Sequence, residues 1–273
     1  MEAGTADTSD DYGTPIYYPS ARDPRFRVQC TQWVSSCEVH GLRIRIPAQA
    51  RAAGGGDGNI VVVDQHSGRE YDLWQVQRSP VGNGGTLTVS HGGAARLHGR
   101  GLDSNATAAG FGRIAGVIRA QELAAGEINH ALYMVVHCDS GSHVYPAHNN
   151  SGRDCSSVGE SNSGAPPLGT RFQLNYSDAE IDALAVPAWK KTILRAMAHY
   201  GLFFTDTGSG SWAIQAESGS TYTSFGYEDE LVKFARTQPE VTSYKGRYLF
   251  NVNDGVDWSR LRVIDPCVTK GTC

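Results

Sequence analysis

Short apolar runs separated by glycines dominate this chain, and they limit the folds that it can adopt. The sequence holds 32 glycines in 273 residues, and many of them stand between short runs rich in β-branched and aromatic residues. This punctuation is typical of tight turns between strands. The regularly alternating long helices of a Rossmann fold or a TIM barrel are missing from the pattern. We therefore predict an all-β, mainly antiparallel fold of β-sandwich or jelly-roll type, with a few short helices.

Two segments carry the clearest strand pattern. In residues 25–46, the apolar residues Phe26 and Val28, and later Leu42 and Ile44, alternate with polar or charged ones, which is the period of a half-buried strand. The run NIVVVDQHSGREYDLWQVQ contains two β-rich stretches joined by turn residues, and it predicts a β-hairpin.

Helical patterns are few and short. The best candidate lies within residues 177–201, where Ile193, Met197 and Tyr200 share a helix face and Gly201 supplies a stop. RAQELAAGE and YEDELVKFARTQ predict two further short helices.

The domain organisation follows from the same patterns. Residues 1–14 lack apolar periodicity and predict a flexible N-terminal arm. Residues 15–273 contain no linker or internal repeat, so we predict that they form a single β-sandwich-like domain. Within it, residues 139–170 form a long stretch without a strand or helix pattern, which favours a functional loop that walls a binding site.

Cysteine spacing indicates the compartment. The six cysteines fall into three pairs that are close in sequence, and close neighbours have the smallest loop-closure cost. The predicted disulfides are Cys30–Cys37, Cys138–Cys155 and Cys267–Cys273. Three such bridges favour an oxidising compartment and predict a secreted, extracellular protein.

Charge and hydropathy narrow the range of partners. Charged residues make up 19% of the chain, the formal net charge is −4, and no run of Lys or Arg occurs. A nucleic-acid partner is therefore not expected. No apolar stretch approaches the roughly 20 residues of a membrane span, so we expect no span. We also expect a monomer.

Three residues are candidates for catalysis. Asp206 ends an apolar strand before a glycine turn, where loss of water contact can raise the pKa of a carboxyl group. His130 lies in the apolar segment GEINHALYMVV, on the same predicted strand face as Leu132 and Met134, and Glu122 precedes it closely enough to orient it. The alternatives are a turn-forming Asp206 and a core histidine that bonds a neighbouring backbone group.

Four further residues are candidates for substrate binding. Asp72 and Trp74 share a face of the predicted hairpin and Asp64 lies nearby, and an indole beside a carboxylate is a common way to hold a sugar ring. Tyr200, at the end of the best helix, joins this set. The alternative is a core tryptophan with turn-forming acids.

Metal and nucleophile signatures are weak. HExxH, CxxC and GxSxG are all missing from the sequence, so we assign no metal and no cofactor. A structural calcium ion stays possible, since the segments DTGSGS and NVNDGVD could supply oxygen ligands.

The segments AGVIRAQELAAGEINHAL, YPA, RFQL and RAMAHYGLFFTDTG bear a family likeness. Together they resemble a group of secreted actinobacterial β-rich proteins of unassigned function that are often found beside carbohydrate-binding modules. The resemblance covers about residues 60–210 and implies a polysaccharide context. It also implies that Asp64, Asp72, Glu122, His130 and Asp206 are the positions of interest.

The favoured hypothesis is an extracellular carbohydrate-active enzyme, a glycoside hydrolase with paired carboxylates acting on a polysaccharide or glycan. Asp206 and Glu122 would be the pair, with His130 positioning them and Trp74 as a stacking platform. Two alternatives stay open. One is a polysaccharide lyase, in which a His or Tyr removes a proton beside a uronate carboxylate. The other is a glycan-binding or surface protein without catalysis.

Overall fold

The computed structural model describes residues 13–76, 80–102, 104–208, 212–244 and 247–273. Residues 1–12, which hold most of the predicted N-terminal arm, lie outside this set. Thr14 is part of the folded structure: it is buried, and its backbone forms a bridge with Glu217.

The first sheet is built on a strictly alternating strand. In β2 (Arg25–Cys30) exposed and buried residues alternate along the whole strand, which places Phe26 and Val28 in the core. Strand β2 pairs antiparallel with β3 (Arg43–Arg45) and parallel with β6 (Gly85–Val89). Leu42, expected on the same buried face, lies before β3 and is exposed.

The predicted hairpin is confirmed and forms the centre of the second sheet. Strand β4 (Ile60–Asp64) is buried along its whole length and pairs antiparallel with β5 (Arg69–Trp74). Strand β1 (Ile16–Tyr17) joins β4 in parallel, and β7 (His91–Arg96) joins β5 antiparallel. The strand order is β1-β4-β5-β7.

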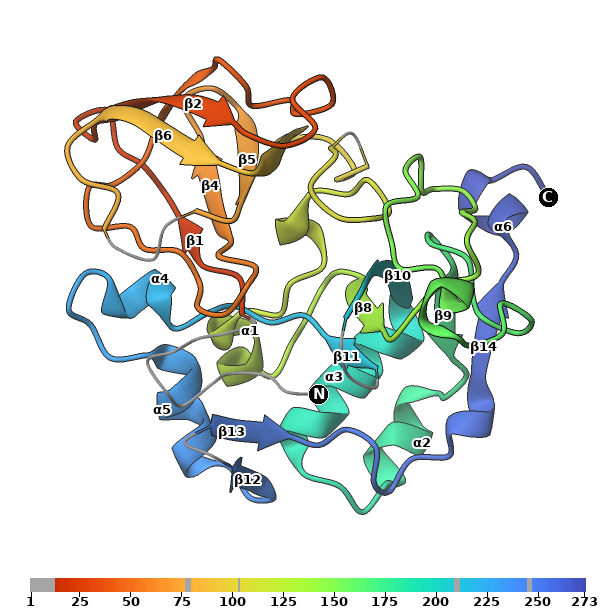
Figure 1. Ribbon diagram of the computed structural model, residues 1–273. Helices are drawn as coiled ribbons and strands as arrows, with labels where there is room; N and C mark the ends of the chain where they lie inside the picture. Colours follow the sequence, from red (N-terminus) through yellow and green to blue (C-terminus); the bar gives the residue numbers. More distant parts are fainter. Residues whose placement is uncertain (1–12, 77–79, 103, 209–211, 245–246) are drawn as a thin grey trace.

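A five-stranded sheet occupies the other end of the molecule (Figure 1), with the strand order β11-β8-β10-β9-β14. Its strands are β8 (Leu132–Val136), β9 (Arg171–Leu174), β10 (Leu202–Thr207), β11 (Ala213–Ile214) and β14 (Leu261–Ile264). Strands β8 and β10 are parallel, and the chain between them forms the long loop, β9 and two helices. A small separate ribbon consists of β12 (Val241–Tyr244) and β13 (Arg247–Phe250).

The described helices are short, as predicted. They are α1 (Ala120–Ala125), α2 (Asp178–Ala183), α3 (Ala188–His199), α4 (Ser220–Thr223), α5 (Glu230–Thr237) and α6 (Pro266–Lys270), with 3₁₀ turns η1 (Arg113–Ala115), η2 (Cys155–Val158) and η3 (Trp258–Arg260). Helix α3 buries Ile193 and Met197 and ends before Gly201, whose φ of +85° allows the turn into β10. No described helix has the length and apolar character needed to cross a membrane.

The fold class is sheet-rich, with 14 strands and few short helices among the described residues. The prediction of mainly antiparallel sheets is wrong, because three of the four sheets contain a parallel pair and are therefore mixed. The parallel pairs arise because long connections return the chain to the same side of a sheet. The β-sandwich arrangement stays a prediction.

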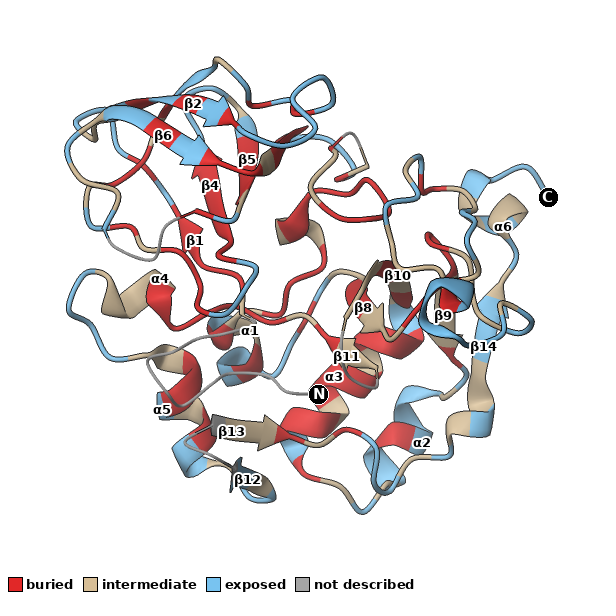
Figure 2. Cartoon of the chain, viewed as in Figure 1, coloured by how far each residue is buried: buried red, intermediate tan, exposed pale blue. Residues whose placement is uncertain are grey.

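The buried apolar side chains gather in two large clusters. Figure 2 colours the buried residues of the chain red. One lies within residues 17–94 and includes Phe26 and Leu73. The other lies within residues 108–252 and includes Trp189, Phe204 and Phe250. The single-domain boundary stays a prediction, and the two clusters matter here because the candidate site lies where residues from both parts of the chain meet.

The predicted disulfide pairs are confirmed. Cys30–Cys37, Cys138–Cys155 and Cys267–Cys273 are bonded, and no described cysteine is free. The second bridge fixes the first half of the long loop, as expected from its position.

Candidate functional site: a groove lined by tryptophan and aspartate

A groove of about 1130 Å³ lies between the N-terminal sheets and the five-stranded sheet. Its lining comes from three parts of the chain that are distant in sequence. One wall carries Trp33, Asp57 and Trp74, and the other carries Asp206 and Trp212. The long loop adds residues 149 and 151–153, which agrees with its predicted place in the wall of a binding site.

Asp206 reaches the groove through an irregularity in β10. The register between β10 and β8 shifts between Phe204 and Asp206, so that Asp206 faces Val135, another groove residue. The sequence pattern had placed Phe204 and Asp206 on one face. The bulge separates them, because the extra residue breaks the alternation of the strand. Phe204 is buried in the core, whereas 26% of the Asp206 side chain is exposed.

The carboxyl group of Asp206 is in an environment that favours a proton. Burial raises the pKa of Asp206, the positive charge of Arg113 opposes that rise, and the negative charge of Asp57 adds to it. Its Oδ1 accepts a 2.9 Å hydrogen bond from the backbone N–H of Thr207. A carboxyl group with a raised pKa in a groove has the property that a general acid requires.

Arg113 stands behind Asp206. Its side chain is only 9% exposed, and Nη2 lies 4.0 Å from Oδ2 of Asp206 and 3.4 Å from the Ala106 carbonyl oxygen. The η1 turn that carries Arg113 is fixed by Glu70, whose Oε1 accepts a 2.9 Å hydrogen bond from the Ile114 N–H. Arg113 is therefore placed by the hairpin sheet and acts on a carboxylate of the other sheet.

Two buried acids lie on the hairpin side of Arg113. Glu70 and Asp72 are two residues apart on β5, so their side chains point to the same face of the strand. They are 3% and 2% exposed. Burial raises the pKa of both, and the negative charge of Glu70 raises the pKa of Asp72 further. Gly112 packs so closely on this pair that a Cβ there would lie 2.8 Å from Glu70 Oε2. The positive charge of Arg113 lowers the pKa of both acids, as it does for Asp206.

Asp57 is the second carboxylate of the groove, and sequence reasoning missed it. It is exposed at the tip of a glycine-rich turn, and its Oδ1 accepts a long hydrogen bond of 3.5 Å from the indole Nε1 of Trp74. Asp57 lies in the segment GGGDGN, and a lone aspartate between glycines carries no periodic signal. Only the tertiary structure brings Asp57 to the same groove as Asp206.

The aromatic residues of one wall form a continuous surface. The rings of Trp33 and Trp74 stack with centroids 6.0 Å apart, and His91 meets Trp33 edge-on. Trp33 is 61% exposed and has a φ of +43°, a conformation that a bulky residue adopts rarely. An exposed stacked pair of indoles is a suitable platform for the apolar face of a sugar ring.

Two amide oxygens in the groove have no partner. Asn59 Oδ1 and Gln215 Oε1 are buried atoms that make no hydrogen bond with any described residue, and both residues line the groove. Asn59 is 4% exposed. Buried polar atoms without partners are rare in folded proteins, and these two oxygens lie beneath the surface of the groove.

Glu122 and His130 lie apart from the groove and form a separate pair. His130 precedes β8, and its Nε2 is 3.0 Å from Glu122 Oε1, while Nδ1 is 2.8 Å from the Ala131 carbonyl oxygen. Glu122 Oε2 accepts a hydrogen bond from the Arg119 N–H and so caps α1. The expected approach of His130 to Glu122 is therefore present, but neither residue lines the groove with Asp206.

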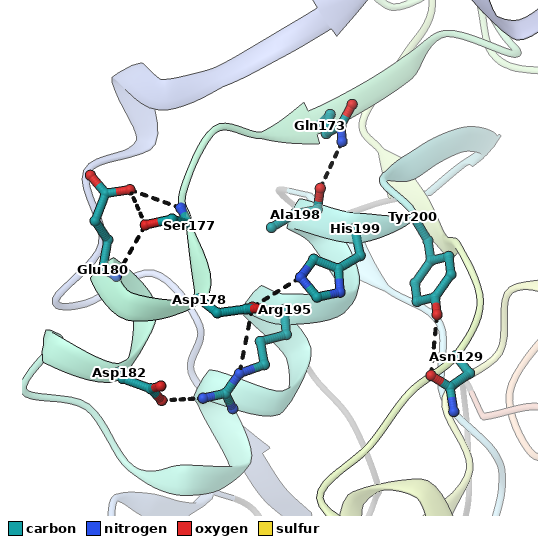
Figure 3. A network of polar contacts seen from close by, with 10 residues as sticks. All are labelled: Asn129, Gln173, Ser177, Asp178, Glu180, Asp182, Arg195, Ala198, His199 and Tyr200. Carbon is teal, nitrogen blue, oxygen red and sulfur yellow. Dashed lines mark hydrogen bonds and ion pairs between the residues drawn. The ribbon is translucent and has the colours of Figure 1, made fainter.

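Of the four predicted substrate-binding residues, one lines the groove and three do not. Trp74 lines the groove, whereas Asp72 is sealed beneath it. Asp64 is 4% exposed and bonds the backbone N–H groups of His66 and Ser67 in the hairpin turn. Tyr200 does not line the groove, and its hydroxyl group donates a 3.2 Å hydrogen bond to Asn129 Oδ1 (Figure 3).

The possible calcium ligands are engaged elsewhere. In the NVNDGVD segment, Asn251 bonds Asp254 and the Lys190 ammonium group bonds the Asp254 carbonyl oxygen, which disfavours a cation there. Residues 209–211 of the DTGSGS segment lie outside the described residues. Among the described residues, one group has metal-ligand spacing: Cys138, Cys155 and Glu160. Its sulfur atoms form a disulfide, so they are not free to bind an ion.

Comparison of the chain with protein-family models, with curated proteins and with solved structures found no match. The resemblance to secreted actinobacterial proteins therefore stays an expectation. Any functional conclusion rests on the groove.

Proposed function

We propose that this protein is a glycoside hydrolase that cleaves a polysaccharide in the groove between its sheets. The observation that carries the proposal is the position of Asp206, a groove carboxyl group whose pKa burial raises although the charge of Arg113 opposes the rise, in a groove that also holds Asp57. Glycoside hydrolysis needs one protonated and one ionised carboxyl group beside the scissile bond. The pair differs from the predicted one, because Asp57 takes the place of Glu122.

The groove provides contacts for a sugar chain as well as for its chemistry. The stacked indoles of Trp33 and Trp74 offer an apolar surface for ring faces. Asn59 and Gln215 line the same groove and add amide side chains to it. Together they would hold a sugar chain across the carboxyl groups, with the ring positions set before the bond breaks.

In this proposal Asp206 is the general acid. It gives its proton to the glycosidic oxygen while the bond from that oxygen to the anomeric carbon breaks. Asp57 either removes a proton from the attacking water or attacks the anomeric carbon itself, and in the second case water then hydrolyses the glycosyl-enzyme ester with Asp206 as the base. The first route inverts the anomeric configuration and the second retains it. The positive charge of Arg113, 4.0 Å from Asp206, limits how far the pKa of Asp206 rises.

The disulfides bear on the compartment in which the protein acts. Three disulfides are compatible with an oxidising compartment, and we include secretion in the proposal. A polysaccharide outside the cell is then the accessible substrate.

The test measures release of reducing ends from a panel of neutral and acidic polysaccharides. Asp206→Asn and Asp57→Asn should each lower the rate about 10²- to 10⁴-fold, the usual cost of losing an acid or base. Glu127→Gln is the matched control, since Glu127 is exposed and lies outside the groove. Circular dichroism of each variant should match the parent chain.

The other outcomes separate the alternatives. Binding of a polysaccharide without cleavage would replace the hydrolase proposal with a glycan-binding role, in which Trp33 and Trp74 act alone. An unsaturated sugar at the new chain end would identify a lyase instead. Full activity of Asp206→Asn would overturn the assignment of the general acid.

A further inference from the structure

Arg153 is a groove residue whose side chain is not used by the fold. It lies in the long loop, is partly buried and lines the groove. Its guanidinium group forms no hydrogen bond or ion pair with any described residue. Arg113 is the other arginine of the groove. Its guanidinium group already lies 4.0 Å from Asp206, and its charge acts on the buried acid Asp72.

The backbone of Arg153 is held firmly although its side chain is free. The Arg153 N–H donates to Thr207 Oγ1 over 2.8 Å, and the Arg153 carbonyl oxygen accepts from the Asp139 N–H over 2.8 Å. Two residues later, Cys155 is bridged to Cys138. A cationic side chain on a fixed backbone is prepared for a ligand, because little backbone ordering remains to be done on binding.

Arg153 is also close to the proposed chemistry. Its hydrogen-bond partner Thr207 directly follows Asp206 in β10. The loop wall that carries Arg153 is separate from the glycine turn that carries Asp57. An anionic group on a bound sugar could therefore meet Arg153 while the second carboxylate lies on the other wall.

We infer that the groove takes an acidic glycan, and that Arg153 binds a carboxylate or sulfate group of a sugar next to the scissile bond. The inference rests on the proposed function and names its substrate class. A guanidinium group fits such anions through two parallel hydrogen bonds, which lysine cannot reproduce in the same geometry. Arg153 is thus a specificity residue, separate from the carboxyl groups that cleave the bond.

The experiment compares paired ligands that differ only in charge. Binding to an oligouronide is measured beside its carboxyl-reduced form, and binding to a sulfated oligosaccharide beside its desulfated form. Each pair is tested by calorimetry with the parent chain, Arg153→Gln and Arg153→Lys. Arg262→Gln is the control, since Arg262 is exposed on β14 and does not line the groove.

The parent chain should bind one acidic ligand roughly 10- to 100-fold more tightly than its neutral form, as expected for a charged hydrogen-bonded pair. The ligand pair that shows this preference tells carboxylate from sulfate. Arg153→Gln should remove the preference, Arg153→Lys should restore part of it, and Arg262→Gln should keep it. Higher salt should weaken binding of the acidic form only.

Two results would overturn the inference in distinguishable ways. If neutral glycans bind and are cleaved as well as acidic ones, or if Arg153→Gln keeps the preference, Arg153 is not the specificity residue and the hydrolase proposal stands. If no glycan of any charge binds, the inference and the proposed function fail together.

Discussion

The guanidinium group of Arg113 lies 4.0 Å from the carboxylate of Asp206, and these two residues come from different elements, the η1 turn and strand β10. The η1 turn sets the position of Arg113, and Glu70 fixes that turn through the Ile114 N–H. Glu70, a buried acid that does not line the groove, therefore helps to place the positive charge that lowers the pKa of Asp206. This arrangement couples the hairpin sheet to the chemistry proposed for β10.

The first prediction concerns this pair and the pH dependence of activity. Because the charge of Arg113 lowers the pKa of Asp206, its removal in Arg113→Gln should raise that pKa further. A general acid works in its protonated form, so the alkaline limb of the pH–rate profile should move to higher pH. Arg113→Lys keeps the charge and should leave the limb near its original place. An unchanged profile in Arg113→Gln would mean that another group sets that limb.

The second prediction concerns the stability of the fold. Asp72 is 2% exposed, and burial together with the charge of Glu70 raises its pKa well above the ordinary value. Its ionised form therefore destabilises the folded state at neutral and alkaline pH. That destabilisation fades as the pH falls through the raised pKa, and below the ordinary value near 3.8 both states are protonated.

Asp72→Asn should accordingly raise Tm at pH 8 and change it little at pH 4. Each kcal/mol gained corresponds to about 2 to 4 °C for a chain of this size. Activity per folded molecule should persist, since Asp72 does not line the groove. A fall in Tm at pH 8 would show that the ionised carboxylate of Asp72 is needed beside Arg113.

The local features of the fold could be predicted from the sequence because they depend on near neighbours. The alternation in β2 and the hairpin of β4 and β5 follow from side-chain period and turn residues. The three disulfides follow from short spacing. The parallel pairing of β8 with β10 could not be predicted in this way, because it depends on where a connection of more than sixty residues returns the chain.

The candidate site was predicted only in part, for a related reason. Asp206 was identified because it ends an apolar strand, and Trp74 because it shares a face of the predicted hairpin with Asp72. Asp57 lies in a glycine turn, and Asn59 and Gln215 are ordinary amides in the sequence. The position of Asp57 in the groove and the burial of the unpartnered oxygens of Asn59 and Gln215 are properties of the folded chain.

The third prediction concerns His130. Burial alone would lower the pKa of His130, but its hydrogen bond with Glu122 raises it. Burial alone would raise the pKa of Glu122, and the bond with His130 lowers it. Since the pair is separate from the groove, His130→Ala should lower the free energy of unfolding by about 1 kcal/mol and leave activity per folded molecule unchanged.

The effect of His130→Ala should depend on pH. The raised pKa of His130 gives stability that is complete below its ordinary value near 6.5 and is lost as the pH rises through the raised value. The lowered pKa of Glu122 gives stability that is present above 4.5 and lost at lower pH. Urea unfolding should therefore show a larger loss at pH 5.5 than at pH 9. His98→Ala, at an exposed histidine, is the control, and a loss of activity in His130→Ala would return His130 to the catalytic residues.

The fourth prediction concerns the loop that carries Trp33. The bridge between Cys30 and Cys37 closes this loop, and Ser36 bonds the Trp33 carbonyl oxygen through both its N–H and its hydroxyl. These contacts hold the exposed indole against Trp74, 6.0 Å between ring centroids. A freed loop would lose this stacked surface, because the positive φ of Trp33 is unfavourable without support.

The double variant Cys30→Ser/Cys37→Ser should therefore bind a polysaccharide ligand about tenfold more weakly, equivalent to about 1.4 kcal/mol. Cys267→Ser/Cys273→Ser is a matched control, since it opens a loop of similar length at α6, outside the groove. Each double variant should lose roughly 2 to 3 kcal/mol of stability, as expected for short disulfide loops. Calorimetry at a temperature where both variants are folded separates affinity from stability. Equal affinities in the two variants would show that the Trp33 platform does not need its bridge, and unchanged binding by Trp33→Ala would remove Trp33 from the sugar surface.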